Sequence, residues 1–122
     1  MTMKEHYFKG LFYMKNGFKK GRKTLVFVHG LSSSSSAWVD YEKKFEGNYN
    51  ILSLDLRGHG KSFRPRKYAE YAIQKFSGDL YSLIMHEHIK KFTIIAHSFA
   101  TIIALDFMIK HQNLLDSAVL LS

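Results

Sequence analysis

The sequence predicts an α/β fold with a mainly parallel sheet and helices on both faces of that sheet. The run at residues 24–28 is continuously apolar after its threonine, as is typical of a strand buried on both faces, and the stretches 49–54, 92–96 and 116–122 are also expected to be buried strands. The stretches between these runs carry hydrophobic residues at helical spacing. Parallel strands need such crossovers, and 122 residues suffice for one domain of this kind. We therefore expect a single α/β domain over residues 1–122.

Turn and capping residues predict the elements in order. Asn16-Gly17 is a favoured hairpin dipeptide, so two short, peripheral, antiparallel strands are expected around it. The five serines at 32–36 follow a buried strand, and they fit an active-site loop whose last serine, Ser36, caps a helix. One face of that helix carries Trp38, Tyr41 or Glu42, and Phe45. A second helix is expected over about 68–85, with Ile73, Phe76, Leu80 and Leu83 on one side.

Composition narrows the classes of function. A hydrophobic content of 46% with 15% aromatic residues excludes a disordered chain, and the absence of cysteine excludes disulfides and thiolate metal sites. The first ten residues contain no apolar core, so we expect no signal peptide and a cytoplasmic location. The net charge of +8 is scattered over 15–23, 61–67 and 90–91, without a recognition helix. We interpret this charge as a solvated surface and expect neither nucleic acid nor a membrane as partner.

The strongest chemical signal is a strand that turns into a helix at Ser98. The run 92–96 is β-branched and apolar, His97 and Ser98 follow it, and helix formers begin at once. The small residues Ala96 and Ala100 stand two before and two after Ser98, where a bulky side chain would clash across a tight turn. This pattern predicts a nucleophile elbow that presents the Ser98 hydroxyl, with the Phe99 N–H placed to stabilise an oxyanion.

Two other short motifs, one for phosphate binding and one for metal binding, are incomplete in this sequence. Gly60-Lys61-Ser62 matches the end of a phosphate-binding loop, but the position that needs the first glycine is Asp55, whose carboxylate would repel phosphate. His86-Glu87-His88 lacks a third ligand at useful spacing, so we expect no metal. The other polar groups, His29-Gly30 and 55–62, follow buried strands as Ser98 does. In a parallel sheet these strand ends share one edge, where ligands bind.

Three stretches together resemble the α/β-hydrolase superfamily of serine esterases and lipases. They are LVFVHGLSSSSSAW, ILSLDLRGHGKS and IIAHSFA, in the order that this family shows. The resemblance implies Ser98 as nucleophile and the backbone N–H groups of Leu31 and Phe99 as the oxyanion hole. It implies an acyl substrate and neither metal nor cofactor. The residues that would hold the loops in place are His29, Gly30, Asp55, Arg57, Gly58 and His97.

The expected acid and histidine of a catalytic triad are not found after Ser98. On a helix that rises about 1.5 Å per residue, Asp106 lies roughly 12 Å and His111 roughly 20 Å along the axis from Ser98. A catalytic base must come within about 3 Å of the nucleophile. Asp116 precedes its strand, at the opposite edge of the sheet. We therefore expect the N-terminal half of a hydrolase, truncated after the strand that follows the elbow helix, without the lid and C-terminal strands.

Two functions follow from this sequence. The first is a serine hydrolase of esterase or lipase type that acts on an ester or amide through Ser98, with its base supplied from outside this chain. The alternative is a non-catalytic α/β-hydrolase-like binding module. In either case the apolar strand with Val119, Leu120 and Leu121 would form an open edge. A complementary C-terminal half, or a second copy of the chain, is the expected partner for that edge.

Overall fold

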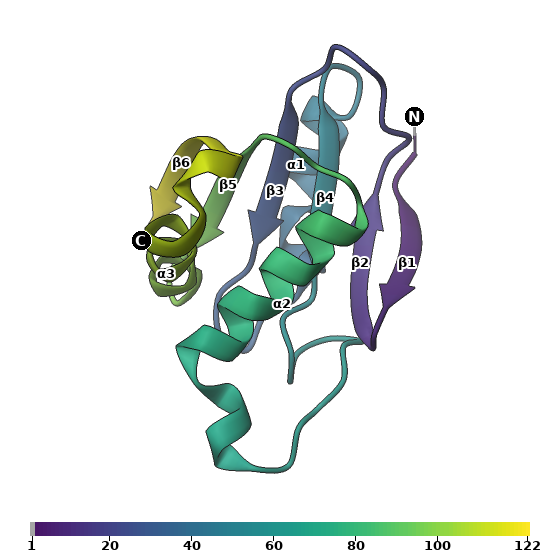
Figure 1. Ribbon diagram of the computed structural model, residues 1–122. Coiled ribbons are helices and arrows are strands. Elements are labelled where there is room, and N and C mark those ends of the chain that lie inside the picture. Colours follow the sequence, from purple (N-terminus) through teal and green to yellow (C-terminus); the bar gives the residue numbers. More distant parts are fainter. Residues whose placement is uncertain (1) are drawn as a thin grey trace.

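A computed structural model describes residues 2–122 and contains a six-stranded sheet in the order β1-β2-β4-β3-β5-β6 (Figure 1). The strands are β1 (Lys4–Phe8), β2 (Leu11–Lys15), β3 (Thr24–Val28), β4 (Asn50–Leu54), β5 (Phe92–His97) and β6 (Leu115–Leu121). The α-helices are α1 (Val39–Phe45), α2 (Ile73–His86) and α3 (Ala100–His111). Short 3₁₀ helices cover Ser35–Trp38, Tyr68–Tyr71 and Gln112–Leu114. Among these described residues, no helix is long and apolar enough to cross a membrane.

The predicted parallel sheet is confirmed. Strands β4, β3, β5 and β6 run parallel, while β1 and β2 add an antiparallel hairpin at one side. Val28 pairs with both Leu54 and Ala96, so β3, β4 and β5 end at the same level. The residues that follow these three strands therefore lie along one edge of the sheet.

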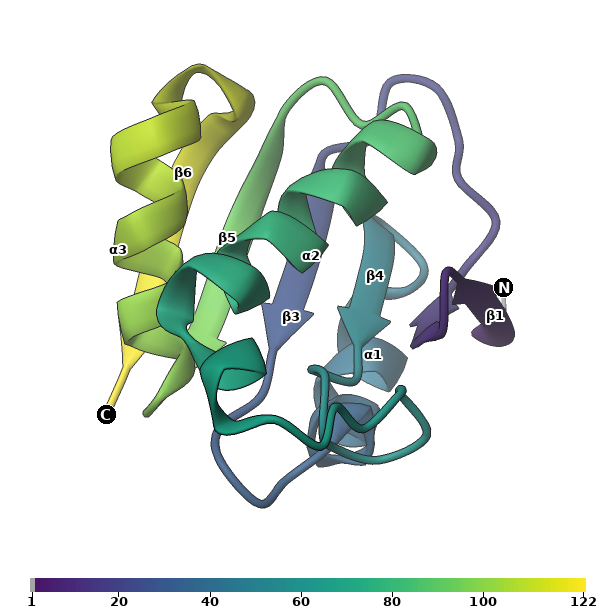
Figure 2. The same ribbon diagram turned by 60° about the horizontal axis from the view of Figure 1, so that its bottom comes forward.

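Helices cover both faces, as predicted. α2 and α3 lie on one face and α1 on the other (Figure 2). On the first face, Phe76 of α2 and Phe107 of α3 are buried in one hydrophobic cluster, in which Phe107 packs edge-on against the fully buried Phe92 of β5. On the second face, Trp38 stacks at a tilt on Phe27 of β3, with ring centroids 4.9 Å apart. Each buried aromatic side chain stabilises the fold by about 1.5–3 kcal/mol.

The predicted hairpin turn at Asn16-Gly17 is wrong. Two antiparallel strands do stand at the N-terminus, but Lys9 and Gly10 join them, with φ of 49° and 80°. Positive φ at both central residues fits the right-handed twist of a two-residue hairpin. Asn16 instead is buried, and its side chain donates to the Tyr49 carbonyl at 2.8 Å and accepts from the Ile51 N–H at 2.8 Å. Its amide therefore satisfies backbone groups at the start of β4.

Two predicted helix starts also need correction. Ser34, and not Ser36, caps the first helical turn, because the Ser34 hydroxyl accepts from the Ser36 N–H. The second helix begins at Ile73 and not near Tyr68. Extended backbone at Ala72, with ψ of 148°, separates it from the preceding 3₁₀ turn. Arg57 explains this break, since its Nη1 donates to the Glu70 carbonyl at 2.9 Å and holds that turn away from the helix axis.

Candidate active site

A sharp turn joins β5 to α3. Only Ser98 and Phe99 lie between them, and Ser98 has a φ of 54°. A non-glycine residue in this left-handed region costs about 1–2 kcal/mol, so surrounding contacts must hold it there. The Ser98 N–H donates to the Leu121 carbonyl of β6 at 2.7 Å, and the Ser98 carbonyl accepts from the Thr101 N–H at 2.9 Å and from the Thr101 hydroxyl at 2.7 Å. The side chain of Ser98 is exposed at the carboxyl edge of the sheet.

The loop after β3 lies directly against this turn. A Cβ added to Gly30 would stand 3.3 Å from both His97 Nδ1 and the His97 carbonyl oxygen, and 3.4 Å from Ser98 Cβ. Ala96 and Ala100, which flank the turn in sequence, are fully buried. The small residues Gly30, Ala96 and Ala100 therefore stand at three closely packed positions around the Ser98 turn.

His29 is fully engaged in holding its loop. Its ring is 1% exposed, its Nδ1–H donates to the Gly30 carbonyl at 2.7 Å, and its Nε2 accepts from the Leu56 N–H at 3.0 Å. These partners assign the tautomer. Burial lowers the pKa of His29, so the ring is neutral in this position. With both nitrogens occupied, His29 has no lone pair left to accept a proton from Ser98.

Asp55 connects the serine loop to the loop after β4. Its buried carboxylate accepts from the Ser35 N–H at 2.7 Å and from the Lys61 N–H at 2.9 Å. Gly60 has a φ of 49°, and a Cβ there would lie 2.1 Å from Asp55 Oδ2. Ser62 adds a third tie, because its hydroxyl donates to the Asp55 carbonyl and accepts from the N–H of Phe12 in β2.

Arg57 anchors α2 to the same loop. Its Nε and Nη2 donate to the two carboxylate oxygens of Asp79 at 2.6 and 2.7 Å. Hydrogen bonding to Asp79 raises the pKa of the Arg57 guanidinium, which stays charged although the residue is 7% exposed. The next residue, Gly58, has a φ of 76°, and a Cβ there would lie 2.5 Å from the Tyr71 ring. Asp79 was not found by sequence reasoning, because one acid on the polar side of a helix carries no signal of its partner.

An open, largely apolar pocket of about 540 Å³ lies beside the Ser98 turn. Its walls are formed by the loops after β3 and β4, by the 3₁₀ turn before α2 and the first turn of α2, and by the residue that precedes α3. Its lining is Leu31, His59, Tyr68, Ala69, Tyr71, Ala72, Ile73, Phe76 and Phe99. Leu31 and Phe99, which were predicted as oxyanion donors, therefore border one common space. Apolar walls of this kind suit a hydrophobic part of a small molecule.

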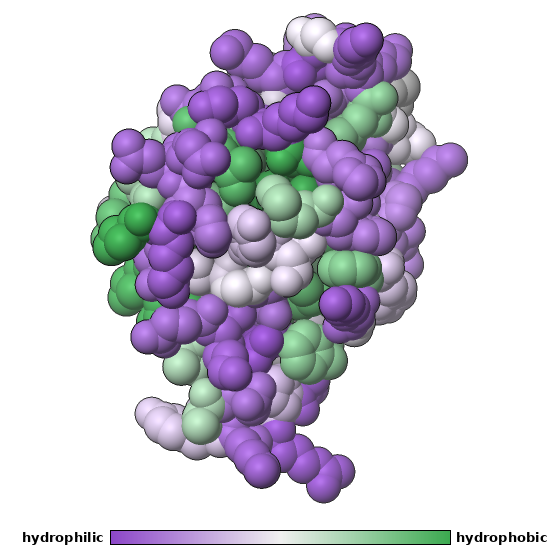
Figure 3. Space-filling view, in the orientation of Figure 1, coloured by the Kyte–Doolittle hydropathy of each residue, from purple (hydrophilic) through white to green (hydrophobic). Residues whose placement is uncertain are grey.

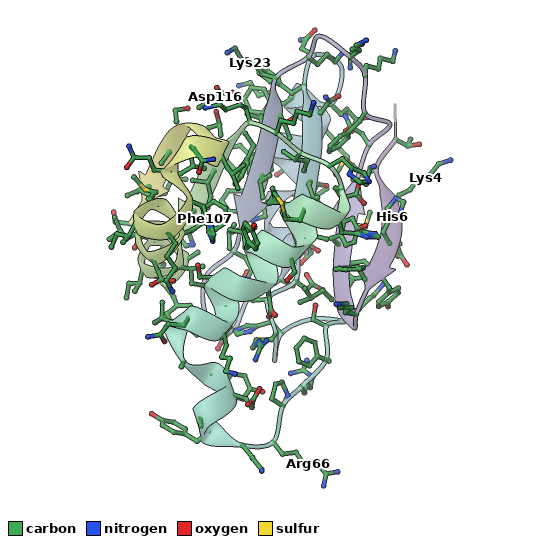
Figure 4. The ribbon with its side chains drawn as sticks, viewed as in Figure 1. Lys4, His6, Lys23, Arg66, Phe107 and Asp116 are labelled. Carbon is green, nitrogen blue, oxygen red and sulfur yellow. The ribbon has the colours of Figure 1, made fainter. Side chains whose placement is uncertain are left out.

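The later acidic and histidine residues do not approach Ser98. Asp106 pairs with Lys110 at 3.0 Å, and His111 stacks on Tyr81 with ring centroids 4.0 Å apart. Asp116 lies at the amino edge of the sheet, on β6 (Figure 4). Among residues 2–122, no side chain hydrogen bonds to the Ser98 hydroxyl, and no group of three or more His, Cys, Asp or Glu could hold a metal ion.

The geometry and the comparisons with known proteins agree on the class. The family model described as alpha/beta hydrolase fold matches residues 23–122, and the chain belongs to this family. Probable lysophospholipase BODYGUARD 2 of Arabidopsis thaliana is 32% identical over 109 residues, which cover 85% of this chain. Epoxide hydrolase 1 of Caenorhabditis elegans is 24% identical over 109 residues, which cover 89%.

Solved structures share the fold. Epoxide hydrolase A from Mycobacterium thermoresistibile aligns with a TM-score of 0.89 at 21% identity over 99% of this chain and 39% of its own. A membrane phospholipase A described as a bacterial virulence factor aligns with a TM-score of 0.88 at 20% identity over 97% of this chain and 39% of its own. The chain thus spans about two fifths of these structures. It spans 23% of the plant relative and 27% of the nematode relative.

Proposed function

We propose that Ser98 is the nucleophile of a hydrolase of esterase or lipase type. The observation that carries this proposal is the left-handed Ser98 turn, which exposes the hydroxyl between the Gly30 loop and the first turn of α3. The N–H groups of Leu31 and Phe99 would form the oxyanion hole, and the apolar pocket that both residues line would receive the acyl chain. His29, Gly30, Asp55, Arg57, Gly58 and His97 would hold the surrounding loops.

The chemistry would follow the two steps of acyl transfer. The Ser98 oxygen bonds to the carbonyl carbon while its proton passes to a general base, and the alcohol or amine leaves with that proton. Water then cleaves the acyl-enzyme and restores Ser98. Because no side chain among residues 2–122 hydrogen bonds to the Ser98 hydroxyl, and His29, Asp106 and His111 have other partners, the base and its orienting acid would come from residues outside 1–122. In this view the chain is the N-terminal part of a hydrolase domain.

The serine itself argues for acyl substrates over epoxides, although some similar proteins are named epoxide hydrolases. A serine that opened an epoxide would be left as an ether, which water does not readily cleave. An acyl-serine ester is cleaved by water with the same base and oxyanion donors. A phospholipid-derived ester is compatible with the apolar pocket, and some similar proteins carry lysophospholipase or phospholipase names.

A fluorophosphonate probe tests the nucleophile, because it labels only activated serines. The experiment uses the whole protein that the gene encodes. We expect mass spectrometry to locate the label on Ser98, with loss of labelling in Ser98→Ala and full labelling in Ser36→Ala, a control at another exposed serine. Absence of labelling, or a label on another serine, would support the alternative, a non-catalytic α/β-hydrolase-like binding module.

We also propose that the open side of β6 is covered by a partner, either a complementary C-terminal part or a second copy. Within residues 2–122, β6 pairs only with β5, and Val119 and Leu120 are each 43% exposed. On the adjacent α3, Ile102, Leu105 and Ile109 are also exposed, and hydrophobic side chains gather at this margin in Figure 3. An unpaired edge strand with apolar neighbours favours association.

Light scattering on the 122-residue chain tests this edge. At tens of micromolar we expect self-association that Ile109→Lys reduces and Tyr68→Lys does not, since Tyr68 is 94% exposed on another part of the surface. A monodisperse monomer would show that the edge needs no partner.

A further inference from the structure

A second pocket lies at the amino edge of the sheet, opposite Ser98. It is shallow, encloses about 480 Å³, and brings together two loops that are some 70 residues apart in sequence. Its basic lining is Lys19, Lys20 and Arg22 from the loop before β3, and His88, Lys90 and Lys91 from the connection between α2 and β5. Among the described residues, neither aspartate nor glutamate lines it. Basic residues that are far apart in the sequence therefore lie together in one concave site.

A buried asparagine fixes the first basic loop. Asn50 is 6% exposed, and its amide nitrogen donates to the carbonyls of Lys19 at 3.1 Å and Arg22 at 3.4 Å. Its amide oxygen accepts from the Lys19 N–H at 2.8 Å. The backbone of this loop is thus held in place, while the side chains of Lys19 and Lys20 remain exposed.

The second basic wall is fixed in a similar way. At the end of α2, the Ile89 N–H donates back to the Ile84 carbonyl at 3.1 Å, and His88 adopts a φ of 57°. Ile89 is 5% exposed and packs into the core. Lys90 and Lys91 follow this anchor directly, and both are exposed at the mouth of the pocket.

Lys19, Lys20, Arg22, Lys90 and Lys91 carry charge that no ion pair within the described part of the chain neutralises. The ion pairs within residues 2–122 involve other basic residues, namely Lys15, Arg57, Lys61, Lys75 and Lys110. Like charges gathered at one site repel each other and produce a positive potential, which attracts an anion of matching size. The upper end of the molecule, where Lys23 of the first loop is labelled, is strongly hydrophilic (Figures 3 and 4).

We propose that this basic pocket binds a compact, multiply charged phosphate compound. The concave shape favours a small ligand over a long nucleic acid, because a strand would need a basic stripe that continues across the surface. Lysine ammonium groups and the Arg22 guanidinium donate charge-assisted hydrogen bonds to phosphate oxygens. The proposal does not depend on Ser98, since the two sites lie at opposite edges of the sheet.

Inorganic tripolyphosphate serves as the probe, and calorimetric titration of the 122-residue chain measures its affinity at two salt concentrations. We expect saturable binding of one ligand per chain that weakens with salt. We expect the Kd to rise at least about tenfold in the double variant Lys90→Ala/Lys91→Ala, and equally in Lys19→Ala/Lys20→Ala. Each of these variants removes two charge-assisted contacts to the ligand. The matched control is Arg66→Ala/Lys67→Ala, an exposed basic pair at the opposite end of the molecule (Figure 4), and it should leave the Kd unchanged.

Circular dichroism and thermal unfolding establish that each variant is folded. Equal weakening in the control and the pocket variants would overturn the proposal, because binding would then be a diffuse effect of net charge. Absence of saturable binding would also overturn it. So would retention on anionic phosphatidylserine vesicles without any affinity for tripolyphosphate, since that result identifies a membrane-docking surface instead.

Discussion

Arg57 binds Asp79 through two parallel hydrogen bonds of 2.6 and 2.7 Å, joining the loop after β4 to the middle of α2. Both side chains are largely buried, so each would be left with uncompensated charge if the other were removed. This pair also sets the position of the 3₁₀ turn that walls the apolar pocket, because Arg57 bonds the Glu70 carbonyl as well.

Replacing Asp79 should therefore destabilise the protein strongly. We expect Asp79→Ala to lower the free energy of unfolding by about 3 kcal/mol, measured by urea denaturation. The control, Lys110→Ala, removes an exposed i,i+4 pair with Asp106 and should cost about 0.5 kcal/mol or less. Similar losses in the two variants would mean that burial of the Arg57–Asp79 pair has no energetic consequence.

The Ser98 turn should not tolerate extra volume. Ala100 is fully buried at the start of α3, and we expect Ala100→Val to cost about 1–3 kcal/mol by overpacking. Ile102→Val, at an exposed position of the same helix, provides the comparison and should change stability much less. A denaturant midpoint unchanged by Ala100→Val would show that the turn is looser than its buried surroundings indicate.

Glu42 should make stability depend on pH. Burial raises its pKa, and among the described residues its Oε2 has no hydrogen-bond partner. The folded protein therefore holds this proton more tightly than the unfolded chain does. The resulting stabilisation is complete below the unfolded pKa and is lost as the pH rises through the higher folded value.

Glu42→Gln removes the titrating group while it keeps the shape. We expect this variant to be more stable than the parent at pH 7 and nearly equal to it at pH 4, as measured by thermal unfolding across that range. A constant difference between the two proteins at every pH would contradict the assignment to Glu42. Glu5→Gln, at an exposed glutamate, is the matched control.

The 122-residue chain by itself should show little or no steady ester hydrolysis. Loss of triad members costs several powers of ten in rate, although oxyanion donors leave some residual catalysis. Steady turnover of a p-nitrophenyl ester by the purified chain, abolished in Ser98→Ala, would refute this prediction. Such activity would mean that a residue within 1–122 rearranges to act as base.

Much of the fold was predictable because its signals are local. The runs 24–28 and 92–96 are long enough and apolar enough to be buried strands, and their order along the chain requires parallel pairing. Since parallel strands end at one edge, the grouping of His29, Asp55 and Ser98 followed from their positions after those strands. The tight Ser98 turn was likewise predicted from the lack of loop residues between strand and helix.

Other features depended on which segments meet in space. Asn16-Gly17 has the local preference for a hairpin, yet Asn16 gains more by satisfying buried backbone groups of β4, and Lys9-Gly10 makes the turn. The start of α2 was misplaced for the same reason, because a distant arginine holds residues 68–71 out of the helix.

The sequence by itself therefore determined the sheet, the edge at which its polar loops gather and the residue at the sharpest turn, because periodicity and strand polarity act over a few neighbouring residues. Only the tertiary structure decided that Arg57 is paired with Asp79, that both nitrogens of His29 are occupied, and that Lys19 and Lys91 line the same pocket. Such pairs are separated by tens of residues, and their distance is set by how helices and loops pack on the sheet. The sequence around one residue of such a pair does not indicate which distant residue it contacts.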